Sequence, residues 1–210
     1  MLTRTLGLLQ EGIDKGLHPG GQIYVSRHGA ILADEAFGES RPGVSMTPET
    51  LMLWLSSGKP VAAIAVMQLI EQGKLRLDDR VEKTVPGFGR GGKAGVTIRQ
   101  LLTHTGGFRP FGLDWPRMSW QEIIEQVCAT PLEEGWTPGG RAGYHTASSW
   151  FILGELVRRT DGRNFAQYVR EEIFLPLGMH DCWIGMPRET YLKYGERISG
   201  IFDMQEGSAV

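Results

Sequence analysis

A serine followed three residues later by a lysine is the pair in this chain whose residue types and spacing best suit chemistry. Ser56 and Lys59 share one face of a helix, because residues three apart are neighbours on a helical surface. A serine hydroxyl attacks only when a base removes its proton, and an amine is a base only in its neutral form, which burial among Leu and Trp side chains favours. The helix dipole would also stabilise negative charge developing at Ser56. The pair therefore predicts a nucleophilic serine with lysine as its base.

A plain structural interpretation of the same residues stays open. Ser56 can be an ordinary N-cap and Lys59 a solvated lysine of the first turn. The spacing of two residues does not decide between these interpretations, so the surrounding sequence has to.

A second candidate is the glycine-rich stretch at residues 87–94, GFGRGGKA, which nearly spells a phosphate-binding loop. It lacks the Ser or Thr that would hold magnesium, and neither a convincing strand before it nor a helix after it is predicted. We interpret the stretch as a mobile glycine loop.

Bulky rings follow the sequence His104-Thr105-Gly106-Gly107. His104 ends a predicted short helix, where we expect it to hydrogen-bond the backbone. Phe108, Phe111 and Trp115 stand in a stretch with neither helical nor strand periodicity. They can belong to the core or wall an apolar pocket for a substrate's acyl group, and both interpretations stay open.

The element that must position Ser56 is a helix beginning near that residue. Apolar side chains recur at helical spacing from Val61 to Ile70, and Gly73 suits a left-handed C-terminal cap. Pro60 fits the first turn, where its missing N–H costs nothing.

The rest of the chain predicts a hairpin followed by helices. Strands are expected at residues 22–26 and 30–37 around a turn at Arg27-His28-Gly29. Beyond Asp181 we expect coil with at most one short helix. The other predicted helices cover residues 2–13, a short helix to Val85 capped by Asp78 and Asp79, 97–103, 119–129 with a Ser119/Glu122 capping box, 147–160 and 165–174.

The composition is that of an ordinary soluble globular protein. The chain has 210 residues, 41% hydrophobic and 22% charged, with a net charge of −2. Nothing is basic enough to indicate nucleic acid, and no apolar run is long enough for a membrane span or a signal-peptide core. We therefore expect a cytoplasmic protein. Cys128 and Cys182 are expected to be reduced, buried thiols.

Five landmarks in one order resemble the serine β-lactamase-like superfamily of class C β-lactamases, DD-peptidases and family VIII-type esterases. The resemblance covers roughly residues 20–185 and corresponds to the N-terminal portion of that family. The landmarks are Ser56-x-x-Lys59, Gly73-Lys74-Leu75-x-Leu77-Asp78-Asp79, Leu101-Leu102-Thr103-His104-Thr105-Gly106-Gly107, Trp136-x-Pro138-Gly139 with Tyr144, and Pro176-Leu177-Gly178-Met179.

The resemblance implies an α+β fold in which an antiparallel sheet with flanking helices adjoins an all-helical lobe. Residues 1–50 would supply the N-terminal helix and first strands, and residues 51–185 the mainly helical lobe with the catalytic motifs. Residues 186–210 would be a coil that starts the missing sheet-completing half. Tyr144 matches the tyrosine of the family's Tyr-x-Asn motif, so it would face Ser56 and Lys59 and shuttle the proton. His145 stands at the variable position and is expected to be only a neighbour.

Two departures from the family pattern bear on function. Thr146 replaces the asparagine, and a threonine hydroxyl is too short to bond both the lysine and a β-lactam amide, which favours esters. The third motif, Lys/His/Trp-x-Gly on a strand, is not found. The sheet is therefore expected to be incomplete, and a second chain or a C-terminal half is expected to complete it and supply the second oxyanion donor.

The sequence thus predicts a serine hydrolase that acts on small carboxylic esters through an acyl-enzyme. Ser56, Lys59 and Tyr144 would be catalytic, and Thr146, Phe108, Phe111 and Trp115 would contact substrate. The alternatives are a β-lactamase or D-amino-acid peptidase, and a non-catalytic binding or scaffold protein of the same fold. No metal or organic cofactor is expected, because the chemistry needs none.

Overall fold

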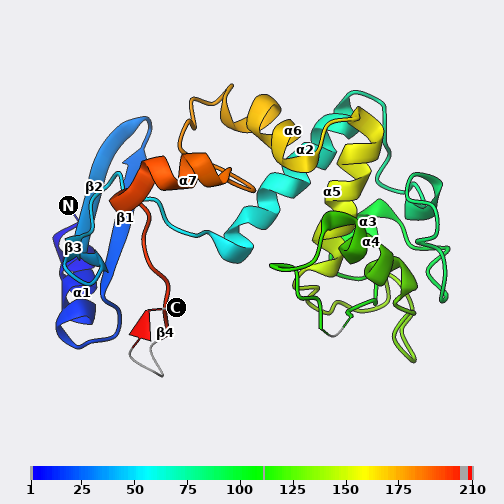
Figure 1. The fold of residues 1–210 in the computed structure, drawn as a ribbon, viewed down its shortest axis with the longest axis horizontal. Coiled ribbons are helices and arrows are strands. Elements are labelled where there is room, and N and C mark those ends of the chain that lie inside the picture. The colour runs from blue at the N-terminus through cyan, green and yellow to red at the C-terminus, as the bar shows by residue number, and fades with distance from the viewer. Residues whose placement is uncertain (1, 111, 204–207, 210) are drawn as a thin grey trace. The chain divides into compact units, whose positions relative to one another are not determined.

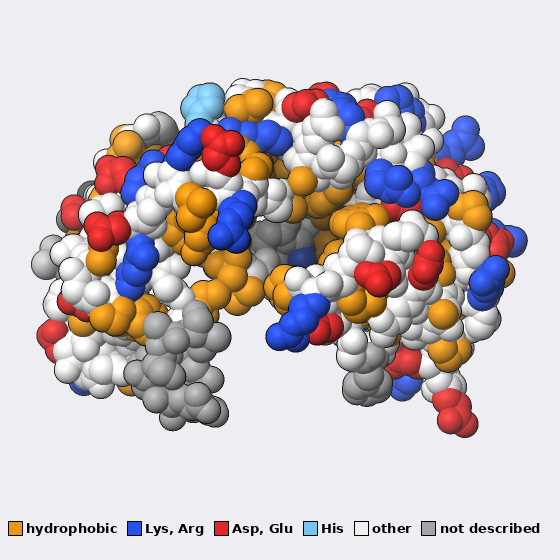
Figure 2. All heavy atoms as spheres, in the orientation of Figure 1, with side chains coloured by type: hydrophobic (Ala, Val, Ile, Leu, Met, Phe, Trp, Pro, Cys, Tyr) orange, Lys and Arg blue, Asp and Glu red, His pale blue; other side chains and the backbone are white. Residues whose placement is uncertain are grey.

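The chain folds into two compact units, described here from a computed structural model. The structure describes residues 2–110, 112–203 and 208–209. One unit combines Met1–Trp54 with Met186–Val210, and the other is Leu55–Gly185. None of the helices in these described ranges is both long and apolar enough to cross a membrane. Positive and negative side chains are interspersed on the face shown in Figure 2, in keeping with the small net charge.

The first unit is built on an antiparallel sheet with strand order β1-β2-β3 (Figure 1). The predicted hairpin is confirmed: its two turn residues, His28 and Gly29, have φ of 50° and 81°, as a tight two-residue hairpin turn requires. The third strand was not predicted. The strands are β1 (Gly20–Arg27), β2 (Ala30–Arg41) and β3 (Val44–Ser45).

Helices flank this sheet in the same unit. The amphipathic helix α1 (Thr3–Asp14) packs on β2 and buries only Gly12, so it is a surface helix. After residue 185 the chain forms α7 (Arg188–Tyr194), as the single short helix expected there. We expected the rest of this segment to be coil, and that expectation was wrong. It also contains the 3₁₀ helix η4 (Gly195–Arg197) and the two-residue strand pair β4 (Phe202–Asp203) and β5 (Ser208–Ala209).

The second unit is helical and is organised around α5 (Ser148–Asp161), drawn in yellow in Figure 1. This helix contacts α2, α3, α4 and α6. Its central residues from Ile152 to Val157 are all buried. Gly154 allows the helix to lie close to Trp120, because a Cβ on this glycine would be only 2.7 Å from the Trp120 ring. The partner helices are α2 (Lys59–Glu71), α3 (Ile98–Leu102), α4 (Trp120–Ala129) and α6 (Phe165–Val169), and a short π-helix, η3 (Arg170–Phe174), continues α6.

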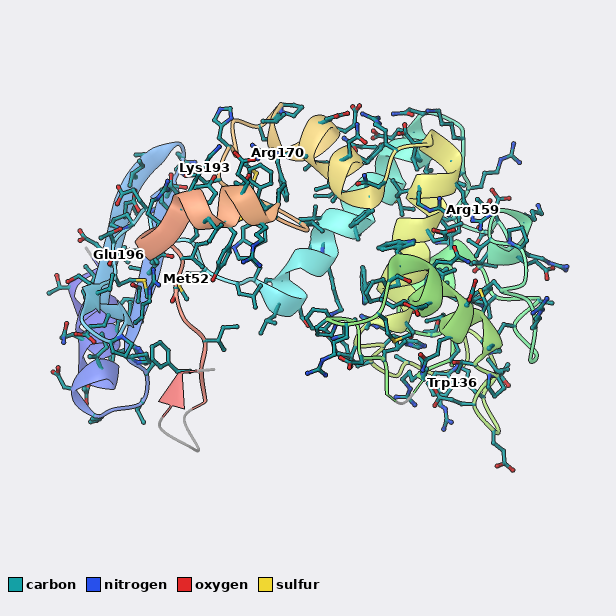
Figure 3. The ribbon with its side chains drawn as sticks, in the orientation of Figure 1. Met52, Trp136, Arg159, Arg170, Lys193 and Glu196 are labelled. Atoms are coloured by element: carbon teal, nitrogen blue, oxygen red, sulfur yellow. The ribbon has the colours of Figure 1, made fainter. Side chains whose placement is uncertain are left out.

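A buried carboxylate stabilises the centre of this unit. Glu155 is fully buried and accepts hydrogen bonds from Arg158, from Arg159 and from the Trp120 indole Nε1 at 2.6–2.8 Å. Arg159 is labelled in Figure 3. Burial alone would raise the pKa of Glu155, but these donors together lower it, so the carboxylate stays charged and ties α4 to α5.

The glycine-rich stretch 87–94 is not the mobile loop that we expected. Its lysine, Lys93, is fully buried and donates from Nζ to the carbonyl oxygens of Arg90, Cys128 and Thr130. The ammonium also lies 5.5 Å from the centre of the Phe88 ring. A lysine satisfied by three backbone carbonyls has none of its donors left for a phosphate, so this stretch is structural.

The aspartates of the Gly73–Asp79 turn also act differently from the prediction. The short helix there is the 3₁₀ segment η2 (Val81–Lys83), and it has no side-chain cap. The Asp78 carboxylate instead accepts hydrogen bonds from Nε and Nη2 of Arg99, and the Asp79 carboxylate accepts the Arg76 backbone N–H. The two carboxylates therefore hold the turn and α3 rather than capping a helix.

Both cysteines are free thiols. Cys128 is buried, whereas Cys182 is only half-buried, which corrects the expectation that both are buried. Burial raises the pKa of each thiol.

Candidate active site

Ser56 lies in a 3₁₀ turn, η1 (Leu55–Gly58), that runs directly into α2. The helical segment thus begins near Ser56 as predicted, and Pro60 stands in the first turn of α2. Leu55, immediately before the serine, has φ of 47°, a left-handed conformation that bulky residues rarely adopt. Ser56 itself is exposed. The turn therefore presents the hydroxyl outward at the N-terminal end of the α2 segment.

Two side chains meet at the Ser56 hydroxyl. The Lys59 Nζ and the Tyr144 phenol each donate to Ser56 Oγ, both at 2.8 Å. Tyr144 comes from the loop before α5, 88 residues further along the chain. The structure therefore brings together the three side chains that the sequence and the resemblance single out.

Aromatic rings surround the lysine. Its Nζ lies 5.1 Å from the centre of the Tyr144 ring and 5.7 Å from that of Trp150. Lys59 is half-buried, whereas Leu55 is 67% exposed. The expected contact with a tryptophan is thus present at Trp150, a second ring comes from Tyr144, and the neighbouring Leu55 does not bury the amine.

The ionisation of Tyr144 is shifted by its two partners. The hydrogen bond to Ser56 and then the neighbouring Lys59 lower the pKa of the phenol. Tyr144 is 53% exposed, so solvent weakens both effects but leaves their direction. The phenolate therefore forms more easily than in a free tyrosine, and a phenolate here would be a general base within hydrogen-bond reach of the Ser56 hydroxyl.

Two histidines hold the loop that carries Tyr144. His104 accepts the His145 backbone N–H at Nδ1, 3.0 Å, which confirms the prediction that His104 bonds the backbone. His145 is fully buried, and its Nε2 accepts the N–H groups of Gly107 and Phe108 at 3.1 and 3.2 Å. It is therefore more than the neighbour we expected, and nothing in the sequence around it signals this role.

A tryptophan joins the same two loops. Trp136 is labelled in Figure 3, and its indole Nε1 donates to the Thr105 carbonyl at 3.1 Å. A Cβ on Gly107 would lie 2.0 Å from the nearest atom of the Trp136 ring, and a Cβ on Gly143 would lie 2.7 Å from it. Only glycine fits at these positions, so the loop carrying His104 and the loop carrying Tyr144 approach each other across the indole.

The four predicted substrate contacts have different surroundings. Phe108 is fully buried and packs edge-on against Phe88 at 5.1 Å, so it belongs to the core and offers no surface to a substrate, contrary to the prediction. Trp115 is 55% exposed. Thr146 is exposed, and within the described part of the chain its hydroxyl has no hydrogen-bond partner. Phe111 lies outside the described residues.

Comparison with known proteins identifies the family. The sequence model of the beta-lactamase family matches residues 7–198. The chain therefore belongs to the beta-lactamase family, whose fold is an α+β arrangement of an antiparallel sheet and a helical lobe.

Individual relatives share this fold but carry different names. "Esterase EstB" of Burkholderia gladioli is 31% identical over 185 residues, covering 78% of this chain and 46% of that protein. "Penicillin-binding protein 4*" of Bacillus subtilis is 28% identical over 174 residues, covering 77% of this chain and 37% of that protein. A penicillin-binding protein homologue from Caulobacter crescentus superimposes with a TM-score of 0.81 at 27% identity, covering 96% of this chain and 54% of its own. The chain thus spans about half the length of the relatives it matches, or less.

Proposed function

We propose that this chain carries the nucleophile and its bases for a serine hydrolase that acts on small carboxylic esters. The single observation that supports this most is the pair of 2.8 Å hydrogen bonds that bring Lys59 and Tyr144 to Ser56 Oγ. An N-cap serine with a solvated lysine would need neither the amine nor the phenol at its hydroxyl. The family's hydrolases provide the class of reaction.

The proposed reaction runs in two halves through one covalent intermediate. In the first, Tyr144 as phenolate, or Lys59 as neutral amine, takes the Ser56 proton while Oγ attacks the ester carbonyl carbon. The tetrahedral intermediate collapses, the bond to the alkoxy oxygen breaks, and the same base returns the proton to the leaving alcohol. In the second half, water loses a proton to the base and attacks the acyl carbon, and Ser56 leaves as the hydroxyl with that proton.

The oxyanion of each intermediate needs hydrogen-bond donors. The Ser56 backbone N–H is the one donor we assign in this chain, because the first turn of a helical segment leaves its N–H groups without intrahelical partners. A missing oxyanion donor typically costs about 10²–10³ in turnover. We therefore propose that full activity requires further polypeptide that supplies the second donor.

Two observations support further polypeptide beside this chain. The sheet of the first unit has only three strands in the described ranges, and β1 is paired on one side only. The helix α2 is apolar around its whole circumference, yet Ile64 and Met67 on it are 48% and 41% exposed. Since the relatives are about twice as long, we propose that a C-terminal half or a second chain covers these surfaces.

The choice of esters over β-lactams rests on Thr146. Its short hydroxyl cannot span a lysine and a β-lactam amide together, as an asparagine amide can. The relative named an esterase agrees with this preference, and the one named a penicillin-binding protein keeps the alternative of a β-lactamase or D-amino-acid peptidase. Turnover of nitrocefin faster than that of esters, or a penicilloyl adduct at Ser56, would favour this alternative.

The test of the proposal is hydrolysis of a chromogenic short-chain ester by the wild type and by Ser56→Ala. We expect turnover to fall to background in the variant, because no other hydroxyl occupies the position between Lys59 and Tyr144. Equal rates would refute the hydrolase. A fluorophosphonate probe that fails to label Ser56 in the complete assembly would instead indicate a non-catalytic binding or scaffold protein.

A further inference from the structure

His104 contacts the backbone on both sides of Tyr144. Its carbonyl oxygen accepts the Gly143 N–H at 2.9 Å, and its ring Nδ1 accepts the His145 N–H at 3.0 Å. To do both, His104 adopts a left-handed backbone with φ of 58°, which is uncommon outside glycine. The two hydrogen bonds hold the peptide groups that flank Tyr144.

The ring of His104 also packs against the phenol itself. The ring centres of His104 and Tyr144 are 4.8 Å apart at an interplanar angle of 32°, and that of Trp150 lies 5.5 Å from His104. Trp150 is fixed in turn, because its indole Nε1 donates to the His145 carbonyl at 3.1 Å. His104 therefore supports the Tyr144 ring as well as its backbone.

The bond to Nδ1 exists only while that nitrogen carries no proton. An imidazole that accepts at Nδ1 is neutral and carries its proton on Nε2. The titratable groups that face His104 are Lys59, Tyr144 and His145. Burial and then the charge of Lys59 lower the pKa of His104, so the neutral ring prevails at neutral pH.

His145 requires the opposite tautomer. Its Nε2 accepts two backbone N–H groups, so its proton must be on Nδ1, which lies 2.6 Å from the Gly143 carbonyl oxygen. Burial lowers the pKa of His145 too. The two histidines thus hold the backbone at Gly143 and His145 as opposite tautomers, His104 with its proton on Nε2 and His145 with its proton on Nδ1.

We propose that His104 is a positioning residue that keeps the Tyr144 phenol at Ser56 Oγ, and that protonation of His104 releases it and stops acyl transfer. The proposal rests on the proposed function for its kinetic consequence, but not for its structural one. As the pH falls through the titration of His104, the His145 N–H loses its acceptor and a second cation arises beside Lys59.

The structural part is tested by long-range ¹H–¹⁵N NMR of the histidine side chains in the full chain. We expect His104 as the Nε2–H tautomer and His145 as the Nδ1–H tautomer, with signals assigned by single substitution. A charged His104 at neutral pH, or an Nδ1–H tautomer, would overturn the proposal whether or not the protein hydrolyses esters.

Two variants separate the role of the Nδ1 acceptor from that of the rest of the side chain. His104→Asn keeps an acceptor oxygen in place of Nδ1, tolerates a left-handed backbone and does not titrate. His104→Leu removes the acceptor. We expect His104→Asn to retain kcat within about threefold at pH 8 and to lose the part of the acid limb that titrates with His104, leaving the part that belongs to Tyr144. We expect His104→Leu to lose about 10² in kcat with KM unchanged.

A readout without substrate decides the matter if the wild type proves inert to esters. The ¹³Cζ signal of Tyr144 reports its ionisation, and we expect its pKa to return towards the ordinary tyrosine value in His104→Leu but to stay lowered in His104→Asn. An unchanged Tyr144 titration in both variants, or an acid limb in His104→Asn identical to that of the wild type, would overturn the proposal. Should His104→Leu fail to fold, His104→Asn and the wild-type titration still decide.

Discussion

The phenol of Tyr144 is the one group at the site whose ionisation both partners favour. Ser56 and Lys59 lower its pKa, so the phenolate forms at a lower pH than in a free tyrosine. A base is needed at the hydroxyl, since both contacts to Ser56 Oγ are donated to it in the structure. The reaction therefore begins only when one of these two donors has lost a proton.

Removal of the phenolic oxygen tests this at the level of a single atom. We expect Tyr144→Phe to lower kcat for a short-chain ester by about 10²–10⁴ with little change in KM, because the proton acceptor is lost while the ring and its packing remain. The rise of rate with pH that belongs to the phenol should disappear as well. Steady-state kinetics across the pH range measure both effects.

Tyr191→Phe is the matched control for that variant. Tyr191 is 53% exposed, the same fraction as Tyr144, and lies on α7 of the other unit. It should have wild-type kinetics. A Tyr144→Phe enzyme with wild-type kcat would show that Lys59 alone is the base.

Single residues were predicted well where the neighbouring sequence constrains them. Ser56 and Lys59 were placed by a helix pattern and Pro60, and the resemblance supplied Tyr144. His145 was not predicted because its role depends on N–H groups 37 and 38 residues away. Such a contact leaves no periodic or local signal in the sequence.

At the level of elements, α5 depends on a carboxylate that is fully buried. Glu155 has its charge satisfied by three donors from α4 and α5. Its lowered pKa means that the folded state holds the ionised form more tightly than the unfolded chain does. The stabilisation is present above the ordinary glutamate pKa and is lost as the pH falls through the folded value.

We expect Glu155→Gln to lower the free energy of unfolding at pH 7 by about 1.5–3 kcal/mol, because charge-assisted hydrogen bonds are lost inside the protein. The difference from wild type should shrink as the pH falls through the lowered pKa of the folded glutamate, where the carboxylate itself becomes protonated. Denaturant unfolding at pH 7 and at acid pH measures it.

Asp114→Asn provides the comparison for an exposed pair in the same unit. Asp114 and Arg117 pair at 2.9 Å with side chains 47% and 84% exposed. Such a pair contributes at most about 1 kcal/mol. Equal losses in the two variants would contradict the importance given to burial at Glu155.

Helices and caps were largely predictable because their signals are local. The Ser119/Glu122 capping box is present, with the Ser119 N–H donating to Glu122 at 2.7 Å and the Glu122 N–H donating to Ser119 Oγ at 3.3 Å. The burial of Lys93 was missed, and whether Phe108 belongs to the core or to a pocket was left open. Both depend on which segments pack over them, and spacing along one segment does not contain that information.

For the whole molecule, the fold and one exposed apolar surface of α2 can be considered together. The sequence predicted the family's α+β fold, and the comparisons confirm it. The exposed apolar face of α2, defined by Ile64 and Met67, is where we propose that the completing half packs.

Ile64→Lys tests that surface. In the 210-residue chain the free energy of unfolding should change by no more than about 0.5 kcal/mol, because the side chain is half exposed there. In a protein of the relatives' length the same change should lower the melting temperature and ester turnover, because a charge would be buried. Differential scanning calorimetry of both forms measures the contrast.

Leu177→Lys is the control, since Leu177 is 69% exposed and lies outside α2. It should leave both forms unchanged. An Ile64→Lys variant that behaves alike in the two forms would show that α2 remains uncovered.

The enclosure of Lys93 has a consequence for how this protein resists digestion. A stretch of four glycines around an arginine and a lysine is ordinarily an easy target for trypsin. Trypsin must draw a basic side chain into its own specificity pocket, and Lys93 is held by three carbonyls with no exposed surface. Native protein should therefore be spared after Lys93, and cleavage at the lysine would report that the helical unit has opened.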